Sequence, residues 1–288
     1  MRRFVLTAAS CLAMACASQP TPSSTPTPAQ PPPPPAPPPP PATQTVRLGP
    51  SALRYVMHQV IHVDQQLPTG PQVLDYGLRI VFAVTISGPA DTSGYPTTIT
   101  IDSVAPDSGT TIPMGINLGA AKALSFRGRL SPRGEFRDPV PSDSVAAQVV
   151  SPIVGSFRNF FPRLPPGGVT LGAAWTDTTT DQQAAVGNIT ITTVNRSRAA
   201  AWEERNGTRA LRLEVASDFK IQGSGQQVGQ PFEVNGTGTR SGVDYIAIDG
   251  RYLGGEAHDS TNMTITLPVQ SLTIPRTQAS RTTVTVLP

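Results

Sequence analysis

Cysteine, histidine, lysine and charged residues in general are scarce in this chain of 288 residues. Its two cysteines, Cys11 and Cys16, lie near the N-terminus, so the remainder of the chain can form neither a disulfide nor a thiolate zinc site. Three histidines and two lysines leave few side chains for general acid–base catalysis or metal binding. Charged residues make up only 14% of the chain. This composition predicts a protein that is not an enzyme and that uses no cofactor or metal.

Blocks of like charge are also missing. The formal net charge is +3, and it falls to +1 once Arg2 and Arg3, which lie in the leader described below, are removed. Acidic residues and arginines alternate along the rest of the chain. Because nucleic-acid binding needs a clustered basic face, no nucleic-acid partner is expected.

The N-terminus has the pattern of a bacterial export signal. The basic start Met1-Arg2-Arg3 precedes an apolar stretch, residues 4–15, that is shorter than the about 20 residues of a membrane span. The stretch ends in Leu12-Ala13-Met14-Ala15-Cys16, which resembles a lipobox, where small residues precede a cysteine that receives lipid. We predict a signal peptide over residues 1–15 and a lipidated Cys16. The protein would then be held in the cell envelope through its N-terminal lipid.

Two alternatives to lipidation at Cys16 stay open. Cys11 also follows small residues, although it would leave an apolar region of only seven residues. Ala13-Met14-Ala15 fits an ordinary signal peptidase, which would cleave before Cys16 without adding lipid. Ala17 and Ser18 lack the aspartate that retains lipoproteins at the inner membrane of many diderm bacteria. We therefore expect the outer membrane as the location.

Proline dominates the segment after Cys16. Residues 20–41 contain fourteen prolines, which fix φ and remove backbone donors, so neither a helix nor a sheet can form there. Such a segment adopts extended polyproline II and reaches ~70 Å. We interpret residues 16–45 as the lipidated cysteine and a linker that carries the following domain away from the membrane.

From Thr45 onward, apolar residues alternate with polar ones. The alternating apolar residues are Ile80, Phe82, Val84 and Ile86, then Ile99 and Ile101, then Ile189 and Ile191, then Leu211, Leu213, Val215, Phe219 and Ile221 with Ser217 interrupting, then Met263, Ile265 and Leu267, and finally Val284 and Val286. One apolar and one polar face is typical of antiparallel sheet. Turns are predicted at 67–70, 131–134, 206–207, 235–236 and 249–250. The fold class is therefore mostly β, as one large curved antiparallel sheet over residues 46–288.

A helical insert interrupts this pattern near residues 143–161. Apolar residues recur there at helical spacing, namely Val145, Val149, Val150, Ile153, Val154, Phe157, Phe160 and Phe161. Pro152 costs ~3 kcal/mol inside a helix but is tolerated as a first helical residue, with Ser151 as N-cap. The spacing predicts two short helices, about 143–150 and 152–161, packed on one face of the sheet.

Two regions resemble uncharacterised bacterial cell-envelope lipoproteins. One runs from Phe161-Pro162-Arg163-Leu164-Pro165 into the segment 168–175, which ends at Trp175, and the other combines Gly236-Thr237-Gly238 with Asp244 and the pair Asp249-Gly250. More distantly, a long sheet with helices on one face is similar to the half-barrel lipoproteins of the LolA/LppX type, which bind acyl chains. The resemblance implies a half-barrel-like fold and an envelope location. It carries over no catalytic residue.

Two motifs with chemical potential are better explained as parts of strands. His58, His62 and Asp64 lie on one face of an alternating segment, where the two histidines would be ~13 Å apart and could not share a metal ion. Ser217 and Lys220 match the S-x-x-K motif, but strand alternation places them on opposite faces. We interpret the first group as a solvated polar face and the second as coincidence.

Three functions follow as hypotheses. The first is a non-enzymatic, membrane-tethered lipoprotein with a structural role or a role in binding an envelope protein. The second is a carrier or sensor of an apolar or lipid ligand held between the sheet and the helices, with Phe157, Phe160, Phe161 and Trp175 as its candidate contacts. The third, an enzyme, lacks a visible polar constellation. Trp175 and Trp202 are otherwise expected as core anchors.

Overall fold

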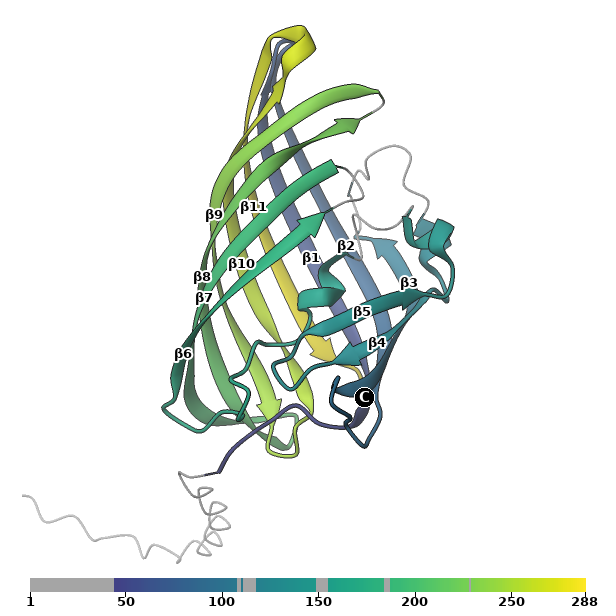
Figure 1. The fold of residues 1–288 in the computed structure, drawn as a ribbon, viewed down its shortest axis with the longest axis vertical. Coiled ribbons are helices and arrows are strands. Elements are labelled where there is room, and N and C mark those ends of the chain that lie inside the picture. The colour runs from purple at the N-terminus through teal and green to yellow at the C-terminus, as the bar shows by residue number, and fades with distance from the viewer. Residues whose placement is uncertain (1–43, 108–109, 111–117, 149–154, 184–186, 228) are drawn as a thin grey trace, which may run out of the picture. The chain divides into compact units, whose positions relative to one another are not determined.

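The computed structural model describes residues 44–107, 110, 118–148, 155–183, 187–227 and 229–288. The predicted signal peptide, Cys16 and the linker up to residue 43 lie outside the described residues. Within the described part, the chain is mostly β, as predicted, and forms an antiparallel sheet of eleven strands (Figure 1). No helix in this part is long and apolar enough to cross a membrane.

The strands are long, and most of them pair with the next strand along the chain. They are β1 (Ser51–Leu67), β2 (Gly70–Ile86), β3 (Tyr95–Pro106), β4 (Ser125–Leu130), β5 (Phe136–Pro141), β6 (Ala174–Gln183), β7 (Gly187–Arg205), β8 (Thr208–Gln227), β9 (Gln230–Ala247), β10 (Tyr252–Leu267) and β11 (Leu272–Val286). Three short 3₁₀ helices accompany them, η1 (Leu118–Ala121), η2 (Gly155–Asn159) and η3 (Pro268–Gln270).

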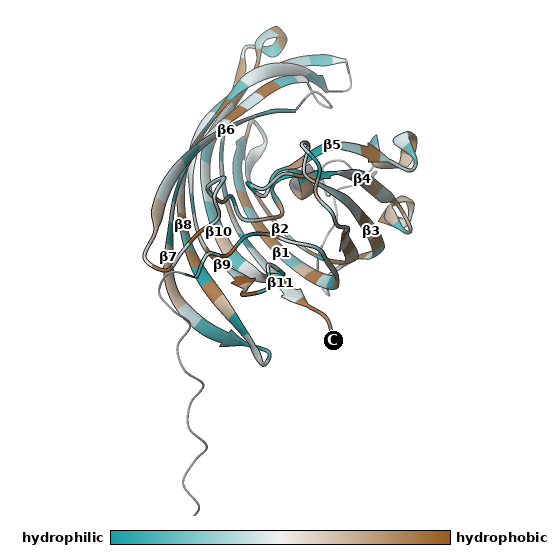
Figure 2. Cartoon of the chain, turned by 60° about the horizontal axis from the view of Figure 1, so that its bottom comes forward, coloured by the Kyte–Doolittle hydropathy of each residue, from teal (hydrophilic) through white to brown (hydrophobic). Residues whose placement is uncertain are grey.

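The sheet is an open meander rather than a closed one. Its strand order is β5-β4-β3-β2-β1-β11-β10-β9-β8-β7-β6, so β1 and β11 meet at its centre while β5 and β6 form its two edges. The sheet curls, and the edge strands come forward from opposite sides (Figure 1 and Figure 2). The chain therefore builds a trough-like sheet with one concave and one outward face.

Alternation along the strands assigns each side chain to one of these faces. Tyr55, Phe82 and Val286 lie side by side on β1, β2 and β11, and all belong to the parity that faces the core. The intervening positions, such as Arg54 and His58, face outward and are exposed. This division confirms the predicted sheet with one apolar and one polar face.

Four of the five predicted turns connect strands, and one does not. The turns at 67–70, 131–134, 206–207 and 249–250 join consecutive strands. Asn235-Gly236 was wrong as a turn, because both residues lie inside β9, opposite Thr264 and Met263 of β10. Gly236 is needed there for packing, since a Cβ on it would lie 2.7 Å from the Cβ of Met263. A glycine that permits close approach of a neighbouring strand looks, in sequence, like a glycine that permits a turn.

The prediction of two helices packed on the sheet is not confirmed. Residues 144–148 form a single helical turn, in which Asp143 accepts hydrogen bonds from the backbone N–H groups of Val145 and Ala146, but Val145 itself is 71% exposed. Residues 149–154 lie outside the described residues. The described part of the second predicted helix is the five-residue 3₁₀ helix η2. Phe160 donates its N–H to the carbonyl of Phe157, which is the i→i+3 bond of a 3₁₀ turn.

Candidate functional site on the concave face

One connection crosses the whole sheet. Because β5 and β6 follow one another in sequence but lie at opposite edges, the chain between them must span the concave face. We call residues 155–173 of this connection the strap (Figure 1). The strap exchanges two backbone hydrogen bonds between Val169 and Val46, with N···O distances of 2.9 and 2.8 Å. It thereby fixes the start of the folded region against the concave side.

The strap inserts three phenylalanines into the part of the concave face that surrounds Tyr55 and Phe82, which we call the lower half. Phe157, Phe160 and Phe161 are 4%, 8% and 2% exposed and belong to the main hydrophobic core. The Phe160 ring has its centroid 5.2 Å from that of Tyr55 and 5.1 Å from that of Phe82, both edge-on. Such ring pairs are stabilising beyond the area they bury. The three rings thus pack on the sheet, while their predicted role as ligand contacts stays a prediction.

Trp175, the fourth predicted ligand contact, lies on the edge strand β6. Its indole is partly buried against the core, and its Nε1 donates a hydrogen bond to the backbone carbonyl of Arg163 at 3.0 Å. Trp202 on β7 is also partly buried, with the Arg209 guanidinium 5.8 Å from its ring centroid. Both tryptophans therefore lie against the core, as expected for anchors.

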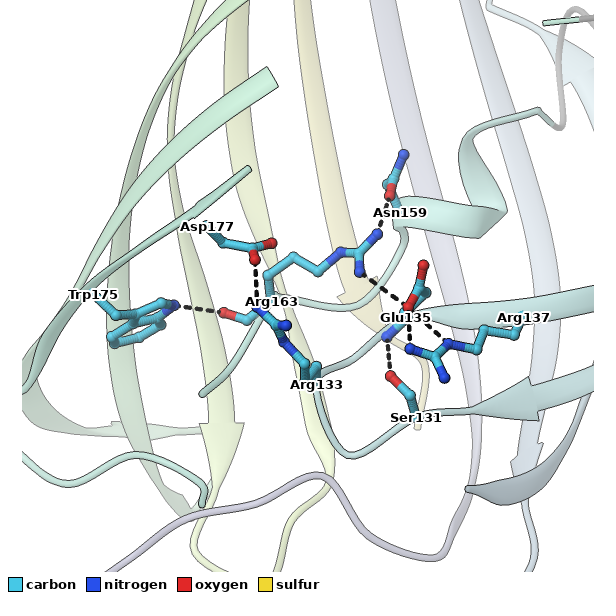
Figure 3. A network of polar contacts seen from close by, with 8 residues as sticks. All are labelled: Ser131, Arg133, Glu135, Arg137, Asn159, Arg163, Trp175 and Asp177. Atoms are coloured by element: carbon cyan, nitrogen blue, oxygen red, sulfur yellow. Dashed lines mark hydrogen bonds and ion pairs between the residues drawn. The ribbon is translucent and has the colours of Figure 1, made fainter. Parts of the chain in front are cut away.

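A polar network beside the strap joins the two edges of the sheet (Figure 3). Arg133, in the turn between β4 and β5, forms an ion pair with Asp177 on β6. Asn159 of the strap donates a hydrogen bond to Asp181 of the same strand at 2.8 Å. Arg163 of the strap lies 3.6 Å from the Glu135 carboxylate at the other edge. The network therefore connects β5 to β6 across the concave side at its lower end.

Glu135 lies at the centre of this network and stays ionised. Partial burial raises the pKa of its carboxyl, but the hydrogen bond from Arg137 and the charges of Arg163, Arg137 and Arg133 outweigh burial and lower the pKa below its ordinary value. Its backbone N–H also bonds to the hydroxyl of Ser131 at 3.1 Å. Each arginine of the network pairs with Glu135 or Asp177, so the network has the features of a structural clamp between the two edges.

A row of polar side chains crosses the concave face higher up. This polar belt consists of Asn195, Ser217, Arg240, Asp259 and Ser280, which are aligned in register on β7 to β11. Ser217 donates a hydrogen bond to Asn195 at 2.6 Å, and Ser280 donates one to Asp259 at 3.1 Å. Arg240 lies 3.7 Å from Asp259, which compensates its charge. The belt divides the aromatic lower half from the remainder of the concave face.

Between the belt and the aromatic core lies a partly buried acid. Asp244 accepts a hydrogen bond of 2.7 Å from the hydroxyl of Tyr252, whose own carbonyl accepts one of 2.8 Å from Tyr55. Burial raises the pKa of Asp244, and the Tyr252 hydroxyl and the charge of Arg240 oppose this rise only in part. Because Gly255 lies opposite, a side chain there would approach the Asp244 carboxylate to 2.6 Å. This glycine leaves room for the acid.

Above the belt, most side chains on the concave face are apolar, although Gln65, Gln72 and Gln278 also face inward. We call this region the upper concave face; its inward-facing apolar residues are Ile189, Ile191, Phe219, Ile221, Phe232, Val234, Met263, Ile265, Leu267, Leu272, Ile274, Val63 and Leu74. Val63 and Val234 are buried, but most of the others keep part of their surface exposed. An open groove of about 990 Å³ borders this end of β8 to β11, and its lining combines Val234, Met263 and Arg276 with outward-facing residues such as Gln222 and Thr264, so it does not belong to the concave face alone.

Glycines on β9 give the upper concave face its close packing. Gly236 and Gly238 occupy inward positions on β9 above Arg240. The ring of Phe219 lies over Gly238, where a Cβ would meet the ring carbon Cζ at 2.2 Å. The missing side chains therefore let Phe219 and Met263 lie close against the backbone of β9.

The outward face of the same strands is polar. His58, His62 and Asp64 are directed outward from β1, which confirms the predicted strand and its solvated polar face. His62 interacts with Asp75 at 2.7 Å and with Asp64 at 3.1 Å, and hydrogen bonds to these two carboxylates raise its pKa. Among the described residues, no group of three or more histidine, cysteine or acidic side chains is arranged to hold a metal ion.

Ser217 and Lys220 are placed on opposite faces of β8, as the alternation predicts. Ser217 faces inward in the polar belt and is 3% exposed, while Lys220 faces outward and is exposed. The geometry required for an acylating serine with a nearby lysine is therefore not formed. Ser217 instead bonds to Asn195 within the belt.

Sequence reasoning missed the polar belt and Asp244 as a group. A signal for the belt was present, because Ser217 interrupts an otherwise apolar row and Arg240 and Asp259 share the inward parity of their strands. Only the strand register, which the sequence does not contain, shows that these interruptions lie at one level. A comparison with known protein families and with curated proteins finds no match for this chain.

Proposed function

We propose that this chain is a non-enzymatic lipoprotein of the bacterial cell envelope that carries or senses an apolar chain-shaped ligand on its upper concave face. Cys16 would carry the anchoring lipid, and the proline-rich linker would hold the sheet away from the outer membrane. The proposal joins the leader, which is read from sequence, with the arrangement of side chains on the sheet.

The single observation that supports a carrier is the contrast between the two faces of the upper strands. Inward-facing residues such as Phe219, Ile221 and Ile265 are apolar and partly exposed, whereas their outward neighbours such as Lys220, Gln222 and Thr264 are polar. A sheet needs an apolar face only where something covers it. The strap fills the lower half of the concave face with its phenylalanines. We infer that a ligand covers the upper half.

The dimensions of this face suit an acyl chain. From the level of Phe219 to that of Leu272 the rows extend about 20 Å along the strands, at ~3.4 Å per residue. Each methylene removed from water on such a surface contributes about 0.8 kcal/mol. An extended hydrocarbon chain can lie along the strands and end near the polar belt, whose paired Arg240 and Asp259 discourage further entry of apolar groups.

A second candidate function, binding of an envelope protein, is favoured by the edge strand β6. Ala174–Gln183 pairs with β7 on one side, and its other side forms an edge of the sheet. An exposed strand edge can accept a strand from a partner protein. Asp177 and Asp181 point inward on this strand and are held by Arg133 and Asn159, which keeps the edge in place.

Substitution of one concave residue and its outward neighbour tests the carrier proposal. Ile221→Asn is expected to weaken binding of the uncharged fluorescent probe N-phenyl-1-naphthylamine at least about tenfold, because it removes an apolar side chain worth ~1.5–3 kcal/mol when fully buried. Thr192→Asn, at an exposed outward position on the neighbouring strand β7, is the matched control and should leave the affinity unchanged. Equal affinities for the two variants and the parent, or no probe binding to the folded parent, would contradict the proposal.

A further inference from the structure

Among the described residues of the upper concave face, one cation, Arg276, has no acidic partner. Arg276 lies on β11 at the inward-facing level, between Met263 of β10 and Gln65 of β1. Its side chain is partly buried, and its Nε is buried without a hydrogen-bond partner. Its guanidinium donates one hydrogen bond, of 3.0 Å, to the amide oxygen of Gln278.

Arg240, in the polar belt just below, has an acidic neighbour instead. Arg240 lies 3.7 Å from Asp259 in the polar belt, and Ser280 saturates the second oxygen of that carboxylate. Among the described residues, Arg276 forms no ion pair, and the inward positions above the belt on β7 to β11, β1 and β2 contain no acidic residue. The acid at the same level, Asp181, lies five strands away on β6 and accepts a hydrogen bond from Asn159.

An unneutralised guanidinium beside apolar side chains is costly unless an anion joins it. Partial removal from water raises the free energy of the charged side chain, and an arginine does not become neutral by losing a proton. Its fork of N–H groups matches a carboxylate or a phosphate, to which it donates two parallel hydrogen bonds. The side chain of Arg276 is only partly buried, so a ligand on the concave face can reach it.

We propose that Arg276 binds the anionic head group, a carboxylate or a phosphate, of an acyl-chain ligand whose hydrocarbon lies on the upper concave face. This inference rests on the proposed carrier function and adds the ligand's charge and orientation to it. The head group lies beside Arg276, and the chain contacts the neighbouring rows that contain Met263, Ile265 and Ile274. Neutral lipids of the same chain length would bind more weakly.

Competition for N-phenyl-1-naphthylamine by three single-chain lipids tests the inference. Oleate and oleoyl lysophosphatidic acid carry the two anionic groups, and monoolein carries the same chain without charge. The parent protein should bind the anionic lipids about tenfold more tightly than monoolein, since a charge-assisted hydrogen bond is worth that much. Arg276→Gln should lose this preference and keep its affinity for monoolein, whereas Arg276→Lys should retain part of it. The relative affinities of oleate and the lysophosphatidic acid identify which anion the site prefers.

Arg281 provides the matched control. It lies on the same strand but faces outward, where it pairs with Glu256 at 2.6 Å, so Arg281→Gln should leave the preference intact. Equal binding of anionic and neutral lipids by the parent would overturn the role of Arg276 while leaving the carrier function in place. An Arg276→Gln protein that keeps the preference would overturn it as well. If none of the three lipids binds the folded parent, the carrier function itself fails.

Discussion

Replacing Phe160 with alanine is expected to lower the free energy of unfolding by about 3–5 kcal/mol. The ring is 8% exposed and lies within 5.2 Å, centroid to centroid, of Tyr55, Phe82 and Tyr252, which belong to three different strands. Its removal leaves a cavity that the sheet cannot collapse to fill, because those strands are fixed by their hydrogen bonds. Thermal unfolding followed by circular dichroism should show a midpoint lower by on the order of 10 °C.

Val269→Ala is the control for this substitution. Val269 lies in η3 and is 73% exposed, so its truncation should change the unfolding free energy by less than about 0.5 kcal/mol. Phe157→Ala should resemble Phe160→Ala, since Phe157 is 4% exposed and its ring packs on Phe82. A Phe157→Ala protein that keeps its stability but loses affinity for an apolar probe would instead place the ligand in the lower half of the concave face.

Replacing Cys16 with alanine is expected to release the protein from the membrane. Lipid attached to this cysteine is the predicted anchor, and attachment of several acyl chains holds a protein far more firmly than one. Phase separation in a mild detergent should move the Cys16→Ala protein from the detergent phase to the aqueous phase. Cys11→Ala is the matched control and should stay in the detergent phase.

The reverse outcome would identify Cys11 as the modified residue. Retention of both variants in the detergent phase would show that the anchor is elsewhere in the chain, and the proposed tether would then be wrong. Retention of neither would show that the leader needs both positions. The test is independent of the folded domain, because these cysteines lie far before Val46, where the buried part of the chain begins.

Period-two alternation predicted strands such as β2, β8 and β10, but it did not predict how they are joined. The alternation that includes Leu211, Leu213 and Phe219 predicts β8, because one face of a strand is apolar and the other is polar. This pattern is visible without knowledge of how the strand pairs with its neighbours. Arg133 and Asp177 form an ion pair although 44 residues separate them. Nothing local to either residue encodes this contact, which depends on the strap crossing from one edge of the sheet to the other.

The helical insert shows a different limit. The spacing of Phe157, Phe160 and Phe161 fits an α-helix, yet the described residues around them form a short 3₁₀ turn and a strap. Three adjacent rings are also placed on one side by a 3₁₀ turn, and packing against Tyr55 and Phe82 decides the outcome. The sequence therefore identified the three phenylalanines as buried and misjudged the backbone that presents them, while Val145 of the same predicted stripe is exposed.

The polar belt was hidden for a related reason. Ser217, Arg240 and Asp259 each look like an isolated interruption in one strand, and their meaning depends on pairings between β8, β9 and β10. Arg276 was missed in the same way, because an arginine flanked by Pro275 and Thr277 is unremarkable until its inward direction is known. Candidate sites on a sheet thus emerge from register rather than from motif.

Native mass spectrometry of the full mature protein, extracted from its membrane in mild detergent, tests the central claim most directly. We expect the folded protein to retain one single-chain anionic lipid that is lost under denaturing conditions, whereas lipid on Cys16 remains attached in both. The Ile221→Asn protein should retain less of this lipid than the Thr192→Asn protein. A folded parent protein that carries no lipid, and acquires none when incubated with oleate, would contradict the account.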